Sequence, residues 1–394
     1  MNRITIDLHA LQHNIQTVDG WMAHNNASWT LVTKALCGHA DTLNALQRLG
    51  IRSMADSRLA NLRSITRLVD DFESWYLRLP HLPAIPDIVE LADVSLNSEM
   101  RSIEALNDEA HRRNLVHRIV VMVELGDLRE GVLPGSLVEF YERTFRLENI
   151  QVVGIGANLG CLSGVVPGID QLAQLVLYHE LLELKFDREL PLISAGSSAV
   201  LPLLLEGKVP APINHYRIGE SVFLGTDLVN GGTLEGLRSD AVTLEADVVE
   251  VREKSLVPMG ETTSMTPFEA FGEEETQPGQ RGYRAVVTVG QLDTDVRGLT
   301  PLHPEYRIAG ASSDLTVLNV GDNPENLAVG DIIRFRPGYG SLVRLMLSPY
   351  VDKQVVPKIK QYMEAVQQSD LVEVPPVYEE PAAGGRPSSR HDES

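Results

Sequence analysis

The chain has 394 residues, so a typical domain size of about 150 residues predicts two or three domains. Its 34 basic and 54 acidic side chains give a formal net charge of −20, which repels phosphate backbones and anionic lipid and argues against a nucleic-acid or membrane partner. No apolar stretch approaches the roughly 20 residues that span a bilayer, and the first residues contain no apolar signal core, so we expect a cytoplasmic protein.

The first 230 residues alternate short β-rich runs with helical patterns, which is typical of a parallel α/β fold. Stretches such as 58–70 and 98–114 have apolar residues three and four apart and predict helices. Eight parallel strands with intervening helices in about 200 residues predict a (β/α)8 TIM-like barrel. We place its strands at 30–33, 52–55, 75–78, 93–96, 118–123, 152–155, 191–194 and 214–217.

From about residue 233 the strand-like runs are joined by turns rather than by helices, which predicts a separate, mainly β C-terminal domain. Its strands are expected at 241–251, 283–289, 315–320 and 331–336. We therefore divide the chain into a barrel (1–232), whose first strand is a candidate to pair with the C-terminal domain, a mainly β domain (233–360) and a helix remnant with a disordered tail (361–394). The tail is assigned from its Pro, Gly, Ser and charged residues.

Polar and small residues follow the predicted barrel strands, at the edge where barrels of this kind collect their reactive groups. The small residues after the last two strands are typical of a phosphate site built from backbone N–H groups. Lys34 follows an apolar strand, where burial would favour the neutral amine that imine chemistry requires. The alternative is a barrel-end lysine that only extends its stem to water. The residues in these positions are Lys34, Arg129, Asn158, Ser197, Ser198, Arg217 and Gly219.

Other motifs give no competing site. The histidines and cysteines have no spacing that resembles a zinc site, so we expect no metal. The stretch Gly154–Gly156 is too short for a dinucleotide-binding fingerprint. We assign His39 and His215 to packing or to phosphate-side hydrogen bonding rather than to catalysis.

Three stretches resemble the alanine racemase superfamily of fold-type III pyridoxal phosphate enzymes, namely Ile6–Ile15, Val32–His39 and His215–Glu220. Further stretches resemble more closely its ornithine racemase-like branch, and they are Glu124–Gly131, Gly156–Cys161 and Ser194–Ala199. Gly310–Asp314 and the segment from Arg336 to Tyr350 extend the likeness into the β domain. Each motif is short, but they occur in order over about residues 4–356.

The resemblance implies that Lys34 holds pyridoxal phosphate as an internal Schiff base. Arg217 would face the pyridine nitrogen, and because a guanidinium only donates hydrogen bonds, that nitrogen would stay unprotonated. A ring with an unprotonated nitrogen is a weak electron sink, and this suits proton exchange at Cα better than transamination. Further cofactor contacts are implied for Arg129, near the phenolic oxygen, and for Asn158. The phosphate would be bound by Ser197, Ser198, the backbone around Gly219 and Glu220, and the hydroxyl of Tyr350.

Racemisation requires acid–base groups on both faces of the planar intermediate, and Lys34 can serve one of them. In alanine racemases a tyrosine from the neighbouring subunit's β domain serves the other, but Gln291 stands at that position here, and glutamine cannot carry a proton. We take Asp314 as the second catalytic residue and expect Gln291 and Ser313 to bind substrate, in a homodimer with composite active sites. The other candidates for the second base are Asp293, Asp295, Cys37 and Cys161.

The resemblance thus implies an amino-acid racemase that interconverts L- and D-amino acids by Cα proton exchange on an external aldimine, with ornithine or another basic amino acid as substrate. One alternative is a fold-type III decarboxylase of basic amino acids. Another is a non-catalytic protein of pyridoxal phosphate homeostasis, although such carriers lack the β domain. A third is cofactor-independent racemisation by Cys37 and Cys161 as a thiol pair.

Overall fold

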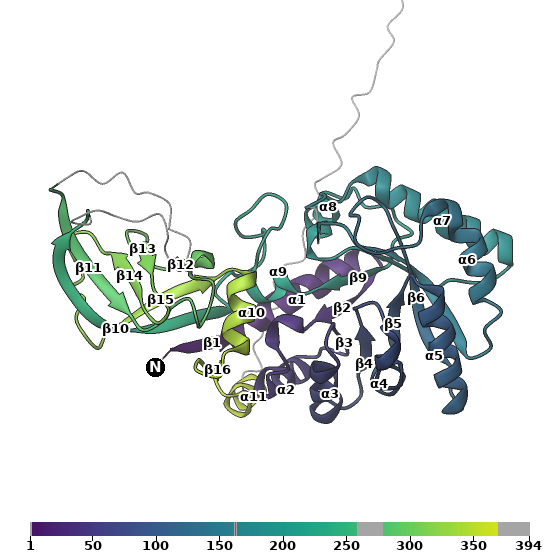
Figure 1. Cartoon of the computed structure of the whole chain (residues 1–394), viewed down its shortest axis with the longest axis horizontal. Helices are drawn as coiled ribbons and strands as arrows, with labels where there is room; N and C mark the ends of the chain where they lie inside the picture. Colours follow the sequence, from purple (N-terminus) through teal and green to yellow (C-terminus); the bar gives the residue numbers. More distant parts are fainter. Residues whose placement is uncertain (1, 161, 163, 258–278, 369–394) are drawn as a thin grey trace, which may run out of the picture.

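A computed structural model describes residues 2–160, 162, 164–257 and 279–368, and within these residues eight parallel strands close into a barrel. Figure 1 shows the barrel on the right and the β-rich part of the chain on the left. Every predicted barrel strand overlaps an observed one, so the predicted fold class is confirmed. The strands are β2 (Ser28–Val32), β3 (Ser53–Asp56), β4 (Glu73–Tyr76), β5 (Val94–Asn97), β6 (His117–Val123), β7 (Ile150–Ala157), β8 (Leu192–Ala195) and β9 (His215–Ile218).

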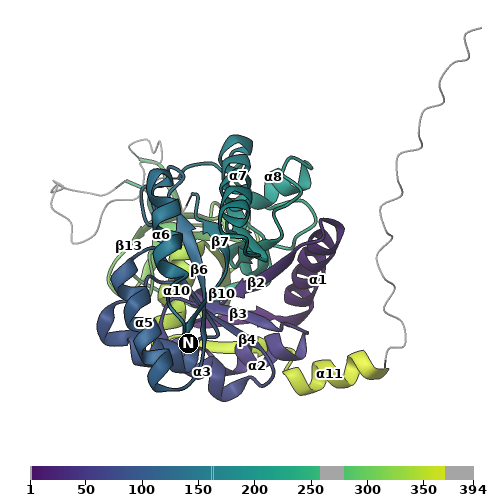
Figure 2. The same cartoon turned by 90° about the vertical axis from the view of Figure 1, so that its right-hand side faces the viewer.

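Helices cover the outside of the barrel, as the view in Figure 2 makes plain. They are α1 (Leu8–His24), α2 (Ala40–Arg48), α3 (Leu59–Leu68), α4 (Ile85–Leu91), α5 (Met100–Arg112), α6 (Leu137–Thr144), α7 (Ile169–Phe186), α8 (Leu201–Leu205) and α9 (Glu220–Leu224). The chain also forms short 3-10 helices, η1 (Lys34–Leu36), η2 (Leu82–Ala84), η3 (Pro134–Ser136), η4 (Ser198–Val200) and η5 (Val296–Gly298). No helix in the described part of the chain is long and apolar enough to cross a membrane.

Two of the barrel helices, α1 and α5, begin at a residue whose side chain caps the first turn. The Asp7 carboxylate accepts the backbone N–H of Ala10 at 2.8 Å and so caps the first turn of α1, and the Glu99 side chain accepts the N–H of Arg101 at the start of α5. Such acceptors satisfy donors that have no partner within the helix. They fix where α1 and α5 begin and thereby how the two helices lie on the barrel.

The barrel has two apolar layers because alternate residues of a strand point to opposite faces. The large layer lies between the strands and their helices and continues into the β domain. A smaller cluster fills the interior and includes Val32, Trp75, Leu96 and Met122. The interior is therefore a packed core rather than a pore, and ligands are confined to its mouths.

The mainly β part of the chain is built around one long strand, β10 (Val242–Ser255), which pairs with β15 on one side and β11 on the other. Its remaining strands are β11 (Arg281–Val287), β12 (Leu299–Pro301), β13 (Arg307–Ala311), β14 (Thr316–Asn319), β15 (Ile332–Pro337) and β16 (Asp352–Val356). A bulge between Val248 and Glu250 marks a shift in the register of β10 against β11. The expected β domain is present, and β12, β13 and β16 are additions that the sequence pattern did not predict.

The N-terminal strand belongs to this sheet rather than to the barrel. β1 (Arg3–Asp7) runs antiparallel to β10 and parallel to β16. Helix α10 (Tyr339–Leu347) lies between the sheet and the barrel in Figure 1, and α11 (Ile359–Gln368) follows β16. The predicted disordered tail from residue 369 onward lies outside the described residues.

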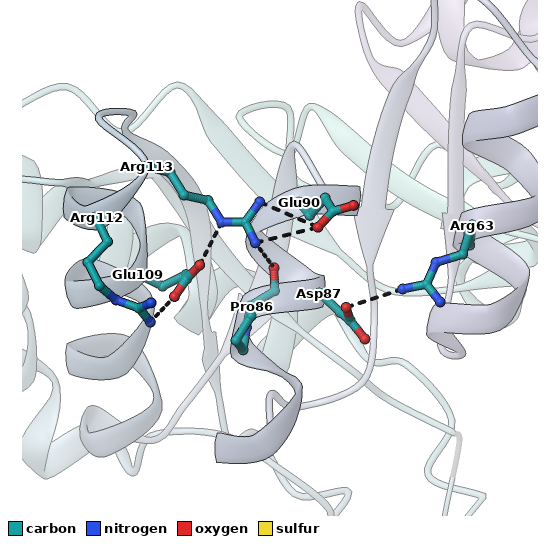
Figure 3. A network of polar contacts seen from close by, with 7 residues as sticks. All are labelled: Arg63, Pro86, Asp87, Glu90, Glu109, Arg112 and Arg113. Atoms are coloured by element: carbon teal, nitrogen blue, oxygen red, sulfur yellow. Dashed lines mark hydrogen bonds and ion pairs between the residues drawn. The ribbon is translucent and has the colours of Figure 1, made fainter.

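On the outer surface, α3, α4 and α5 are joined by a network of ion pairs (Figure 3). The Arg113 guanidinium donates to Glu109 at 2.6 Å, to Glu90 at 3.4 Å and to the carbonyl of Pro86 at 3.1 Å. Arg63 of α3 pairs with Asp87 of α4 at 3.2 Å. The contacts of Arg113 to Glu90 and Pro86 join α5 to α4, and the Arg63–Asp87 pair joins α3 to α4, whereas the Glu109–Arg113 pair lies at the end of α5 itself.

Candidate active site

A cavity of about 860 Å³ opens where the barrel strands end, on the side that faces α10. Its volume lies within the range of about 300–1,000 Å³ that small-molecule sites occupy. The structure brings most of the predicted site residues together around it. Those that line it are Lys34, Arg129, Asn158, Ser197, Ser198, Arg217, Gly219 and Glu220.

Lys34 is the first residue of η1, directly after β2 and Thr33. The expectation that Lys34 is buried is wrong, because the strand ends at Val32 and the lysine projects from the rim of the cavity as an exposed residue. Its Nζ lies 5.8 Å from the centre of the Tyr339 ring of α10, within the range of a cation–π contact. The amine is therefore accessible to a ligand and faces an aromatic side chain of the β domain.

Arg217 of β9 is only 3% exposed, at the base of the cavity. Its Nη1 donates to the Ser194 carbonyl at 3.0 Å and to the Ser194 hydroxyl. Its Nη2 donates to the carbonyl of Ala157 at 2.8 Å and to Asn158 Oδ1 at 2.6 Å. Hydrogen bonds to β8 and to the end of β7 thus fix the plane of the guanidinium. A fixed plane is what a group that orients a ligand needs.

The ends of β8 and β9 form a small polar cup on one wall. The Ser198 hydroxyl lies 3.3 Å from the backbone N of Gly219 and 3.4 Å from that of Ser221, so the start of α9 is tied to η4. A Cβ at position 219 would lie 2.7 Å from the carbonyl oxygen of Val32, so only glycine lets this turn approach the strand that precedes Lys34. Hydroxyls and backbone N–H groups therefore gather next to the lysine.

A second wall contains a carboxylate that the sequence analysis did not single out. Glu130 lines the cavity, with a side chain 9% exposed, and forms an ion pair with Arg129. It also accepts a hydrogen bond from Asn158 Nδ2, so Arg129, Glu130, Asn158 and Arg217 form one connected set.

The loop that carries Glu130 folds back against β6. The backbone N–H of Val132 donates to the carbonyl of Met122 at 2.8 Å, and Gly131 has φ +147°, a conformation open to glycine. A Cβ at Gly131 would also meet the backbone N of Glu124 at 2.2 Å. The glycine at 131 is thus the signal in the sequence that could have placed Glu130 at the barrel end.

The tyrosine at the cavity is Tyr339 and not the predicted Tyr350. Tyr350 does not line the cavity, and its side chain is 80% exposed, so its placement gives the predicted phosphate contact no support. Tyr339, which the sequence analysis quoted only as part of a motif, lines the cavity beside Lys34. The turn Pro337–Gly338 begins α10 and turns Tyr339 toward the barrel.

The three β-domain residues predicted for the site gather in a separate cluster that does not reach the cavity. The backbone N–H of Gln291 donates to the Ser312 carbonyl at 3.0 Å, and the Ser313 hydroxyl donates to Asp314 at 2.6 Å. Close packing of Gly290 on Ser313 holds the two loops together, because a Cβ at position 290 would lie 2.3 Å from the Ser313 carbonyl oxygen. Within one copy of the described chain, Gln291, Ser313 and Asp314 therefore form their own surface.

The other candidates for the second base differ in their surroundings. Burial, with a smaller contribution from the nearby Asp314 charge, raises the pKa of Asp293. The hydrogen bond from Arg297 holds the pKa of Asp295 below its ordinary value and so makes it a weak base. Burial, with the Asp56 charge adding, raises the pKa of the Cys37 thiol to about 11, which keeps it protonated near neutral pH. Cys161 lies outside the described residues.

This donor set fits an aromatic aldehyde that carries a phosphate. The cavity offers an accessible amine, a fixed guanidinium and a cup of hydroxyl and N–H donors, which are the groups that a carbonyl, a ring nitrogen and a phosphate require. For metals, no group of three or more His, Cys, Asp or Glu side chains able to hold an ion occurs in the described parts of the chain.

Comparison with known proteins agrees with this geometry. Residues 6–227 match the family model described as alanine racemase, N-terminal domain. The chain belongs to this family. It is 36% identical to the ornithine racemase of Acetoanaerobium sticklandii over 357 residues, which cover 90% of this chain and 99% of that protein. It is 31% identical to the lysine racemase of Thermotoga maritima over 362 residues, which cover 91% and 99%.

Solved structures of the alanine racemase type share the fold at lower identity. The alanine racemase of Bartonella henselae with covalently bound pyridoxal phosphate superposes with a TM-score of 0.70 at 15% identity, covering 90% of this chain and 99% of that one. The coverage extends over both the barrel and the β domain. The family model and the two racemases of over 30% identity confirm the family resemblance read from the sequence motifs.

Proposed function

We propose that the chain is a pyridoxal phosphate-dependent amino-acid racemase that acts on ornithine or another basic amino acid. The observation that carries the proposal is the placement of Lys34 and Arg217 on one cavity that also holds a polar cup of Ser198 and Gly219. The identity to an ornithine racemase and a lysine racemase over nearly their full length supports the reaction type and the class of substrate.

The residues of the cavity take separate roles in this proposal. When bound, pyridoxal phosphate supplies an electron-accepting ring that makes the Cα proton of an amino acid easier to remove. Lys34 holds the cofactor through its amine and then moves a proton on one face of the substrate. Arg217 orients the ring through a donor that cannot give up its proton. Phosphate contacts are assigned to Ser197, Ser198 and the backbone around Gly219 and Glu220, and further contacts to Arg129 and Asn158.

The second face of the substrate needs an acid–base group, and none of the described candidates named for it from the sequence lines the cavity in one copy of the chain. We assign it to Asp314, with Gln291 and Ser313 as substrate contacts, contributed by a second copy in a homodimer. The cluster of these residues on one surface of the β domain supports the assignment. The protonated state of the Cys37 thiol argues against a role for it as a base. We place the enzyme in the cytoplasm.

The direct test follows proton exchange and chirality together. The protein with pyridoxal phosphate is incubated in deuterium oxide with single L-amino acids, and Cα exchange and the D-isomer are measured in each sample. We expect exchange with inversion, fastest for ornithine or lysine. Lys34→Ala should lose both the visible absorbance of the lysine-bound cofactor and at least 10³-fold of the rate. Retention of both in Lys34→Ala would refute the proposal.

The same samples separate the alternatives. Release of carbon dioxide without a D-isomer would identify a decarboxylase. Cofactor absorbance without exchange on any amino acid would identify a non-catalytic carrier. Exchange in protein free of cofactor, blocked by thiol alkylation, would identify the thiol mechanism.

A further inference from the structure

A chain of hydrogen-bonded side chains crosses the interior of the barrel from the cavity to the opposite mouth. It begins at Arg217, whose Nη1 contacts the Ser194 hydroxyl. Ser194 Oγ lies 2.7 Å from His215 Nδ1, and His215 Nε2 lies 3.0 Å from Thr30 Oγ1. The chain continues from Thr30 Oγ1 to Ser53 Oγ at 2.8 Å and from there to the Glu73 carboxylate at 3.5 Å.

The two ends of this chain fix the direction of every bond in it. A guanidinium can only donate, and an ionised carboxylate can only accept. Ser53 therefore gives its single hydroxyl proton to Glu73 and must accept from Thr30. Thr30 has then used its own proton, so it must accept from His215.

His215 is consequently a donor at Nε2 and an acceptor at Nδ1. Ser194 gives its proton to Nδ1 and keeps its oxygen lone pairs for the N–H of Arg217. Five groups thus donate in one direction, from Arg217 at the cavity to Ser53, and Glu73 accepts at the end of the chain. Aligned hydrogen bonds polarise one another, so each strengthens the next.

The surroundings of His215 keep the ring neutral and still. It is 3% exposed and stacks on the indole of Trp75, with ring centres 4.6 Å apart and an interplanar angle of 10°. Burial, with the nearby positive charge of Arg217 adding, lowers the pKa of His215 to about 3. The indole N–H of Trp75 donates to Glu73 at 2.6 Å, so the stacking partner is anchored by the same carboxylate that ends the chain.

We propose that His215 is a positioning residue for Arg217, held as the Nε2-protonated tautomer by this one-way chain to Glu73. The inference rests on the proposed function in so far as Arg217 is taken to face the cofactor ring. The ring of His215 does not reach the cavity; it acts by making Ser194 Oγ a fixed acceptor for Nη1. Glu73 sets the direction of the chain from the far mouth of the barrel.

The barrel supplies a matched control on the neighbouring strands. His117 Nε2 lies 2.8 Å from Ser95 Oγ, and both side chains are buried in the same interior. Ser95 Oγ also accepts from Asn97 Nδ2 at 2.9 Å, so the pair belongs to a different set of hydrogen bonds from the chain that begins at Arg217. Substituting His117 therefore removes a buried, hydrogen-bonded histidine, as substituting His215 does. His117, however, has no proposed role in positioning Arg217.

The first experiment reads the tautomer directly in protein without cofactor. Ring ¹⁵N resonances of histidine are recorded for the wild type, and the His215 ring is assigned by its loss in His215→Asn. We expect a protonated Nε2 and an unprotonated Nδ1. In Glu73→Gln the amide can donate as well as accept, so we expect the second tautomer to become populated. A wild-type ring protonated at Nδ1, or a Glu73→Gln spectrum unchanged at His215, would overturn the proposal.

The second experiment measures consequences at the cavity. We expect His215→Asn to bind pyridoxal phosphate about 10-fold more weakly and to lower kcat about 10- to 100-fold, with KM for the amino acid changed less than about 3-fold. His117→Asn should change both the cofactor affinity and kcat less than about 3-fold. Equal effects of the two variants would reduce His215 to a structural residue and refute the proposal. Because cofactor affinity and the NMR spectra need no turnover, they decide it even where racemisation itself is not found.

Discussion

The cavity at the barrel mouth and the outer surface of α3 to α5 each hold an arginine in a network, but the two networks have different partners. Arg217 donates to the oxygens of Ser194, Ala157 and Asn158, which are neutral. Arg113 donates to the carboxylates of Glu109 and Glu90. Neutral acceptors at the ends of two strands fix the direction in which a guanidinium points, whereas carboxylates mainly neutralise its charge and join helices. The same residue type therefore positions a ligand in one region and stabilises the fold in the other.

The largest expected difference between the two regions is in activity. Arg217→Lys keeps the charge but loses the planar fork of donors, so we expect racemisation to fall about 100-fold or more. The matched variant Arg113→Lys should leave kcat within about 2-fold, since it lies on the outer surface. Steady-state kinetics of both variants make the comparison. Wild-type activity in Arg217→Lys would remove the distinction between the two networks.

A smaller loss is expected where the cavity itself holds a carboxylate. Glu130→Gln removes the charge that holds Arg129 and weakens the contact to Asn158. We expect kcat/KM to fall about 10-fold, measured by polarimetry or chiral chromatography. Glu139→Gln, an exposed residue of α6, serves as the control and should behave as the wild type. An unchanged kcat/KM in Glu130→Gln would show that the ion pair serves only stability.

The surface network should respond in stability alone. Arg113→Ala leaves the Glu109 carboxylate, which is only 3% exposed, without its donor at 2.6 Å. We expect Tm to fall by about 2–5 °C while kcat stays within about 2-fold. Thermal unfolding followed by circular dichroism gives the first value. A loss of activity without a loss of Tm would contradict the assignment.

The smallest effect concerns the dependence of stability on pH. The hydrogen bond from Arg113, with the Arg112 charge adding, holds the pKa of Glu109 below its ordinary value. A depressed pKa means that the unfolded chain binds the proton more readily, so the stabilisation is present above the ordinary carboxyl pKa of about 4.3 and is lost as pH falls below it. The Tm difference between wild type and Glu109→Gln should therefore shrink from pH 7 toward pH 3. A difference that does not change with pH would refute the ionic account.

The sequence predicted the barrel well because its strands are buried on both sides and separated by amphipathic helices. The strand predicted at 118–123, for example, is observed as His117–Val123. Two strands lack such a signal. β12 is short, and the side chains of β16 alternate between exposed and half-buried. The rule that reactive groups follow strands found Lys34 and Arg217. It missed Glu130 and Tyr339, because a loop that folds back and a helix of another domain bring these side chains to the cavity.

The placement of β1 has a consequence for biosynthesis. Its residues Arg3–Asp7 leave the ribosome first, yet they pair with residues 242–245 and 352–356, which are made much later. The barrel can close while β1 still has both edges open, and an open strand edge is a site of mispairing between chains. The β sheet is therefore completed only when the whole chain is available. A chain halted after residue 232 would retain the barrel strands but leave β1, which precedes them, with neither partner, and we expect such a fragment to aggregate.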